Sequence, residues 1–178
     1  MEPYPMPTQS TILTLSMRTP LGEMLAGAAQ QGICLLEFAD SGRAGPELRR
    51  LEKRLGAAAG PGESPLLERL QTQLDEYFAG QRRQFDLPLA TAGTPFQQRV
   101  WAGLRAIPYG ETRSYRQLAE ELGHASAVRA VGKANADNPI AILVPCHRLI
   151  GSDGSLIGYG GGLWRKQRLL ELEKAVGG

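Results

Sequence analysis

The hydrophobic pattern of this chain changes character near residue 92, and that change constrains the fold more than any other feature. Before it, apolar and polar residues alternate, as over residues 11–17, which is typical of β-strands. After it, residues 94–97 (TPFQ) and 114–117 (SYRQ) each place a hydroxyl three residues before a glutamine, which predicts a capped helix start. We therefore predict an α+β protein with two domains, residues 1–92 and 93–178.

The first domain is expected to be a small α/β unit. Residues 1–10 resemble a loose tail, and residues 11–38 are predicted to form strands. A serine and a proline at Ser64-Pro65 predict a helix start, and the apolar positions that follow keep helical spacing as far as Gly80. Three further elements are expected before the second domain: a helix over 46–55, a strand over 85–89 and a linker over 90–93.

The second domain is expected to be mainly helical. Two short helices joined by a turn at Gly123-His124 have the outline of a helix-turn-helix. Ser126 can cap the second of these helices, which should run to about Ala136. Residues 148–157 are predicted to form a small hairpin around an Asp-Gly turn, and residues 163–175 a final helix.

The composition indicates a globular protein. Of 178 residues, 42% are hydrophobic and 21% charged, which argues against disorder. No apolar run approaches the length of a membrane span, and the N-terminus lacks the pattern of a secretory signal, so a cytoplasmic location is expected. Residues 93–178 carry eleven Lys and Arg against seven Asp and Glu, whereas residues 1–92 carry nine against eleven. This asymmetry indicates a polyanionic partner for the second domain.

Two cysteines and two histidines leave little room for a metal site, and none is predicted. Cys34 lies in a strand-like run, where a small buried filler is the expected role. The sequence leaves open a disulfide between Cys34 and Cys146, although an intracellular chain usually keeps its thiols reduced.

The segment Pro145-Cys146-His147-Arg148 places a thiol next to an imidazole, after an apolar run over 140–144 that predicts a buried extended segment. A thiol is a strong nucleophile only as its thiolate, and a neighbouring imidazole favours that form. Glu171 and Glu173 follow on the final helix, from which a carboxylate could orient the imidazole. A Cys-His pair on its own is more often structural, so these residues form a candidate site only in combination.

The helix over 126–136 has a second face that is unusually small and basic. Arg129, Gly132, Lys133 and Ala136 share it, opposite the apolar positions. Cations beside very small residues would let a helix backbone approach a phosphate-lined groove. An ordinary solvated face explains the same residues equally well without the rest of the chain.

Taken together, these segments resemble the O6-alkylguanine-DNA alkyltransferases, also called the methylated-DNA–protein-cysteine methyltransferase family. The resemblance extends from Thr94 to Glu173. It is carried by short motifs in the family's order and spacing: residues 96–101 (FQQRVW), 107–112 (IPYGET), 114–119 (SYRQLA), 129–132 (RAVG), 138–139 (NP), 145–148 (PCHR), 158–162 (GYGGG) and 169–173 (LLELE). The resemblance implies a ribonuclease-H-like first domain and a second domain with a winged helix-turn-helix.

The implied activity is DNA repair by transfer of the alkyl group from O6 of guanine to Cys146. In that chemistry His147 withdraws the thiol proton and Glu173 holds the imidazole and stabilises its cation. The resemblance gives Tyr115 the role of proton donor to the leaving guanine, assisted by Lys166 and Gly160. Asn138 is expected to tie the helix-turn-helix to the cysteine segment. Packing alone also explains Tyr115, and a solvated helix start also explains Lys166.

The implied partner is duplex DNA carrying O6-alkylguanine, from which the damaged base must be flipped out of the stack. Arg129 corresponds to the family's arginine finger, and Tyr115 would help rotate the nucleotide. The remaining residues expected to contact DNA are Ala130, Gly132 and Lys133. The residues expected to line the substrate pocket are Val144, Pro145, Tyr159 and Gly160. Arg148 is expected to make either DNA contacts or internal bonds.

The product would be a thioether, which is not hydrolysed in cells, so each molecule should act once. No cofactor is needed because the alkyl group is already on the DNA, and no nucleotide-binding motif is present. A monomer is expected, with cooperative assembly on DNA left open. Two other functions share some of these features. A lesion-binding protein without activity would lack the reactive cysteine, and a cysteine hydrolase would not need Arg129 beside a helix-turn-helix.

Overall fold

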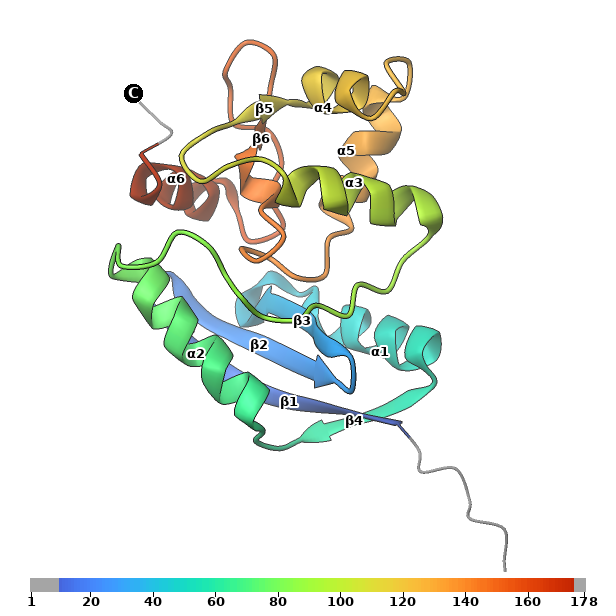
Figure 1. Ribbon diagram of the computed structural model, residues 1–178, viewed down its shortest axis with the longest axis vertical. Coiled ribbons are helices and arrows are strands. Elements are labelled where there is room, and N and C mark those ends of the chain that lie inside the picture. Colours follow the sequence, from blue (N-terminus) through green and yellow to red (C-terminus); the bar gives the residue numbers. More distant parts are fainter. Residues whose placement is uncertain (1–9, 175–178) are drawn as a thin grey trace, which may run out of the picture.

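The computed structural model describes residues 10–174. The predicted tail over residues 1–9 and the end of the last helix at Ala175 lie outside the described residues. The structure confirms the α+β class: a sheet with two helices forms the first half, and helices dominate the second half above it in Figure 1.

The first half is built on a four-stranded sheet in the order β3-β2-β1-β4. Its strands are β1 (Ser10–Thr19), β2 (Gly22–Ala29), β3 (Gly32–Phe38) and β4 (Ala57–Pro61). The first three are antiparallel neighbours, and β4 pairs with β1 in parallel. The helices of this half are α1 (Ala44–Leu55) and α2 (Pro65–Phe78), and a short 3-10 turn, η1 (Ala39–Ser41), follows β3.

The predicted start of α2 is confirmed. The Ser64 side chain accepts a hydrogen bond from the backbone N–H of Leu67, and Pro65 occupies the first turn, where its missing N–H costs nothing. The helix buries one face against the sheet, including Leu70, Leu74 and Tyr77. It ends before Gly80, whose φ of +75° favours glycine.

The strand predicted over 85–89 is wrong. This segment pairs with the edge of β3 at a single bridge, between Ile33 and Leu89, because only two backbone bonds form there and Pro88 has no N–H to donate. Gly32 permits the approach, since a Cβ at this position would collide with the Pro88 carbonyl.

The second half contains four helices and a two-stranded parallel sheet among its described residues. The helices are α3 (Pro95–Arg105), α4 (Tyr115–Glu121), α5 (Val128–Ala136) and α6 (Leu163–Leu172). The strands are β5 (Arg113–Ser114) and β6 (Leu149–Ile150), preceded by a 3-10 turn, η2 (Cys146–Arg148). Both predicted capping boxes are confirmed at the starts of α3 and α4. The Trp101 indole then donates to the Ala134 carbonyl at 2.8 Å and joins α3 to α5.

Three local predictions in this half fail. Ser126 does not cap α5: the N-cap is Ala127, without a side-chain bond. The hairpin over 148–157 does not form, because β6 pairs with β5; only the turn closed by the Gly151 N–H and the Ser155 carbonyl remains. The apolar run 140–144 is buried as expected but folds into turns rather than an extended segment.

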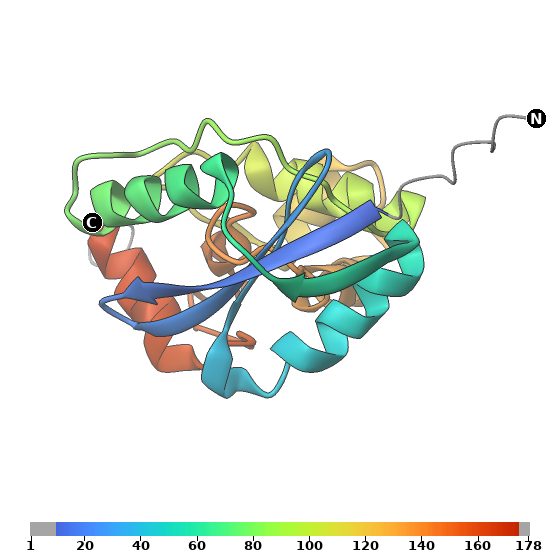
Figure 2. The ribbon, with the colours of Figure 1, turned by 90° about the horizontal axis from the view of Figure 1, so that it is seen from below.

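The two halves share one hydrophobic core. A single buried cluster contains Met17 and Leu36 from the sheet together with Trp101, Val144 and Leu169 from the second half. Strand β3 lies at the centre of this contact: every residue in it is buried, and Leu36 bridges to Ile140 in parallel. Seen from below, the sheet lies across the helices of the second half (Figure 2). Along residues 10–174, no helix has the length and apolar character required to cross a membrane.

Candidate active site

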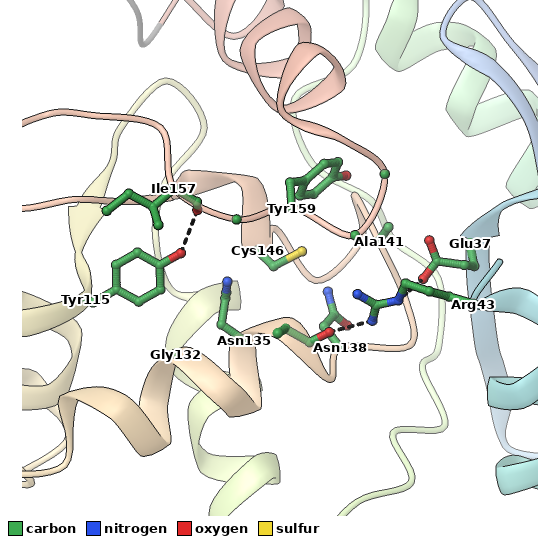
Figure 3. Close-up of a pocket in the computed structure, with 14 residues that line it drawn as sticks. Glu37, Arg43, Tyr115, Gly132, Asn135, Asn138, Ala141, Cys146, Ile157 and Tyr159 are labelled. Carbon is green, nitrogen blue, oxygen red and sulfur yellow. Dashed lines mark hydrogen bonds and ion pairs between the residues drawn. The ribbon is translucent and has the colours of Figure 1, made fainter. Parts of the chain in front are cut away.

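Cys146 begins η2 and opens onto a cavity of about 470 Å³ between the two halves of the molecule. The thiol residue is 8% exposed, and Figure 3 shows its sulfur facing the space between Tyr159 and Asn138. The cavity is lined from the second half by α5, the segment around Asn138 and the loop 157–161, and from the first half by Glu37 and Arg43. Both cysteines are free thiols, so no disulfide forms between Cys34 and Cys146.

Asn138 shapes the turn that delivers the cysteine. Its amide group donates to the Val144 carbonyl at 2.8 Å, and its oxygen accepts from the Ile140 N–H at 2.9 Å. These bonds close the turn from both sides, and Ile142 within it has a φ of +71°, which is rare for a β-branched residue. The buried Asn138 therefore stabilises the turn between the end of α5 and Cys146.

His147 and Glu173 form a fully buried pair. The His147 Nε2 lies 2.9 Å from the Glu173 Oε2. Burial alone would raise the pKa of Glu173, but the hydrogen bonds and charges of His147 and Arg148 outweigh it and hold that pKa at about 2. Because the carboxylate is ionised at neutral pH, it accepts and the Nε2–H donates. This assigns the proton to Nε2 and leaves Nδ1 as the basic nitrogen.

The protonation states of Cys146 and His147 allow His147 to act as the base that takes the thiol proton. Burial lowers the pKa of His147, although the hydrogen bond and charge of Glu173 oppose the effect. Burial raises the pKa of Cys146, and a hydrogen bond with Asn138 and the charge of Lys166 offset part of the rise. The resting site therefore holds a thiol and a neutral imidazole. The Nδ1 of His147 finds no hydrogen-bond partner among residues 10–174, so it is available to take a proton.

Glu173 is held by two further residues. Arg148 donates from Nε to Oε1 at 2.8 Å and from Nη2 to Oε2 at 3.0 Å, and a third bond joins it to the Ile107 carbonyl. Of the two predicted roles of Arg148, internal bonding is the one observed. Tyr77 of α2 donates to Oε2 at 2.6 Å. Glu171 is exposed, so Glu173 is the carboxylate that meets the imidazole.

Lys166 and Tyr115 fix the loop that covers the cavity. The Lys166 ammonium is completely buried and donates to the carbonyls of Ile157 and Gly158 at 2.9 and 3.2 Å. Burial lowers its pKa to about 8. The hydroxyl of Tyr115 donates to the same Ile157 carbonyl at 2.9 Å, and Figure 3 shows its ring at the cavity wall opposite Arg43. A solvated helix start is therefore wrong for Lys166.

The predicted pocket residues divide into two groups. Tyr159 and Gly160 line the cavity, and the Tyr159 hydroxyl is buried without a hydrogen-bond partner among the described residues. Val144 and Pro145 do not line it: Val144 is wholly buried and holds the turn through its bond with Asn138.

Sequence reasoning missed Glu37, Arg43 and Tyr77. Arg43 pairs with Glu37 at 3.4 Å and donates to the Ala136 carbonyl, so it connects β3 with the end of α5 across the cavity. No local motif marks these residues, because each meets the site through contacts far along the chain.

Of the residues predicted to contact DNA, Tyr115 begins α4 and the other four lie along α5. Arg129, Ala130 and Lys133 are exposed, and Arg129 makes no hydrogen bond or ion pair with the described residues. Lys133 pairs with Asp137 at 3.0 Å. Gly132 borders the cavity, where a Cβ would lie 3.6 Å from the Tyr115 ring. Gly132 and Ala136 of this helix face and the buried Cys146 therefore line the same cavity, and the cations Arg129 and Lys133 lie outside its lining.

A thiol beside a neutral imidazole that is held by a buried carboxylate defines a cysteine-nucleophile protein. Residues 12–91 match the family model described as 6-O-methylguanine DNA methyltransferase, ribonuclease-like domain, and residues 95–175 match the DNA binding domain of the same family. The chain belongs to the 6-O-methylguanine DNA methyltransferase family.

Relatives and solved structures agree with this assignment. A methylated-DNA–protein-cysteine methyltransferase of Mycobacterium leprae is 64% identical over 103 residues, which are 58% of this chain and 62% of that relative, so the match spans less than two thirds of the relative's length. A relative of that name from Methanosarcina barkeri is 43% identical over 89% of this chain and 94% of its own. The structure of Mycobacterium tuberculosis OGT in complex with DNA superposes with a TM-score of 0.76 at 42% identity, covering 93% of each chain.

Proposed function

We propose that this protein repairs DNA by taking the alkyl group of O6-alkylguanine onto Cys146. The observation that carries the proposal is Cys146 in the lining of a cavity, followed in the chain by a histidine that is paired with the buried Glu173. Membership of the family and the similarity to a structure solved with DNA support duplex DNA as the partner.

In the proposed reaction the Cys146 sulfur attacks the alkyl carbon, and the bond between that carbon and O6 breaks. The thiol proton passes to Nδ1 of His147, directly or through a water, and Glu173 stabilises the resulting imidazolium. The departing guanine takes a proton from the Tyr115 hydroxyl, close to the charge of Lys166; solvent then returns a proton to Tyr115, and the His147 imidazolium releases the thiol proton to solvent. The product is a thioether, which no group in this reaction sequence cleaves, so one molecule repairs one lesion without a cofactor.

We infer that DNA approaches along α5. Arg129 would fill the space left by the flipped base, while Ala130, Gly132 and Lys133 would lie near the backbone. Tyr159 and Gly160 would contact the flipped base. In this assignment the second domain, residues 93–178, carries the DNA-binding and transfer functions, and the protein acts as a monomer. The cytoplasmic location stays a prediction.

The decisive test is intact-mass analysis after incubation with a duplex that carries one O6-methylguanine. The expected result is a gain of one methyl group per protein molecule, saturating at one equivalent, and no gain in the variant Cys146→Ala. Tight binding without a mass change would instead support a lesion-binding protein, and repeated turnover of an ester would support a hydrolase.

A further inference from the structure

The hydroxyl of Tyr77 reaches the candidate active site from the other half of the molecule. Tyr77 lies near the end of α2, and Figures 1 and 2 both show that end beside the end of α6. It donates to the Glu173 Oε2 at 2.6 Å across a separation of 96 residues. Tyr77 is 0% exposed and Glu173 2%, so water does not compete for this bond.

The bond falls on the same oxygen that His147 uses. The Glu173 Oε2 receives three donors: Tyr77 at 2.6 Å, His147 at 2.9 Å and Arg148 at 3.0 Å. Each donor draws negative charge from the oxygen and fixes its direction. The tyrosine hydroxyl is the shortest of these contacts, and its proton is secure because burial and the charge of Glu173 raise the pKa of Tyr77 well above its usual value.

We propose that Tyr77 is a positioning residue for alkyl transfer: it orients Glu173 and limits the negative charge that this carboxylate presents to His147. The inference rests on the proposed function and extends it, because it makes the first half of the chain part of the reactive site. The titratable and charged groups that face the Glu173–His147 pair are Tyr77 from α2, Tyr109 from the loop after α3, Cys146 and Arg148 from η2, and Lys166 from α6.

Loss of the Tyr77 hydroxyl should raise the pKa of His147. Without the Tyr77 hydroxyl, Oε2 keeps two donors and carries more negative charge. That charge favours the imidazolium, so the pKa of His147 rises. Since the reaction needs neutral His147, the rate increases as pH rises through this pKa, and the increase should then occur at higher pH.

The variant Tyr77→Phe tests this directly, because it removes one oxygen and keeps the ring packed against Phe78 and Tyr109. The measurement is the single-turnover rate of methyl transfer from duplex DNA between about pH 4 and pH 8. We call the part of the profile where the rate rises with pH the acid limb, and we expect it to shift to higher pH by about 0.5 to 1 pH unit. An acid limb that stays at the wild-type pH, whatever the absolute rate, would overturn the proposal, because a merely structural loss scales the rate equally at every pH.

Two further variants complete the test. Tyr109→Phe is the matched control: its ring adjoins Tyr77, but its hydroxyl meets the Leu172 carbonyl at 3.4 Å rather than the carboxylate, so its acid limb should not move. A fluorinated tyrosine placed at position 77 keeps the bond with a stronger donor, so its acid limb should move to lower pH; an upward shift or none would count against the proposal. If wild-type protein acquires no methyl group at all, the proposed function fails instead, and this outcome is visible before any variant is compared.

Discussion

Single residues explain why we propose Cys146 and not Cys34 as the reactive thiol. Burial raises the pKa of both thiols, to about 11 for Cys34 in β3, so the pKa shift does not separate them. Cys146 opens onto the cavity, and His147 follows it in the chain. The sequence was sufficient to identify Cys146, His147 and Glu173 as candidates, because they lie in recognisable motifs. Tyr77 could not be found in this way, since an aromatic residue on the apolar face of a helix is indistinguishable from an ordinary core residue.

Replacement of Glu173 by glutamine should destabilise the protein by about 3 to 5 kcal/mol, because it leaves the buried Arg148 guanidinium without its counter-charge. Urea unfolding measures this change. Glu171→Gln, on the exposed face of the same helix, should stay within about 0.5 kcal/mol of wild type. Equal stability of the two variants would show that the buried pair contributes little.

The same pair predicts how stability depends on pH. The folded pKa of Glu173 is about 2, below its usual value of 4.5. Its contribution is therefore complete above about pH 4.5 and is lost as pH falls toward 2. In Glu173→Gln this part of the acid dependence should be absent.

At the scale of elements, capping and periodicity predicted most helices correctly. Ser64, Thr94 and Ser114 each begin a helix as their side chains indicate. Local reasoning failed where pairing is decided at a distance. β6 pairs with β5 rather than with its own neighbour, and the apolar run before Cys146 becomes a turn because Asn138 supplies its bonds.

The exposed face of α5 gives a prediction at this scale. Arg129→Ala should slow transfer from duplex DNA by about tenfold or more, because the flipped-out state loses the side chain that fills the stack. Transfer from the free base O6-benzylguanine, which needs no flipping, should keep its wild-type rate. Arg168→Ala removes an exposed cation from α6 and should change neither rate. Equal slowing with both substrates would place Arg129 in the chemistry rather than in flipping.

The whole molecule is organised around β3, which joins the sheet to the cysteine segment. The backbone of Leu36 donates to the Pro139 carbonyl and accepts from the Ala141 N–H, both at 2.9 Å. Arg165 of α6 donates two hydrogen bonds to the Asp40 carboxylate. Its guanidinium also stacks on the ring of Phe38, the last residue of β3. Such contacts join residues about a hundred positions apart, so the sequence predicted two parts but not their shared core.

A shared core should make the two halves unfold together. We expect a single calorimetric transition whose calorimetric and van't Hoff enthalpies agree. Leu36→Ala should lower its midpoint as one transition, because the cavity costs about 2 to 5 kcal/mol in a core common to both halves. Two separate transitions would contradict this view of the molecule.

The central claim is that the alkyl group ends on one particular sulfur. The most direct measurement is peptide mapping by tandem mass spectrometry after reaction with duplex DNA whose O6-methyl group carries carbon-13. The account predicts the heavy methyl group on Cys146 in every reacted molecule and none on Cys34. Label on Cys34, or unlabelled protein after the DNA has been repaired, would contradict it.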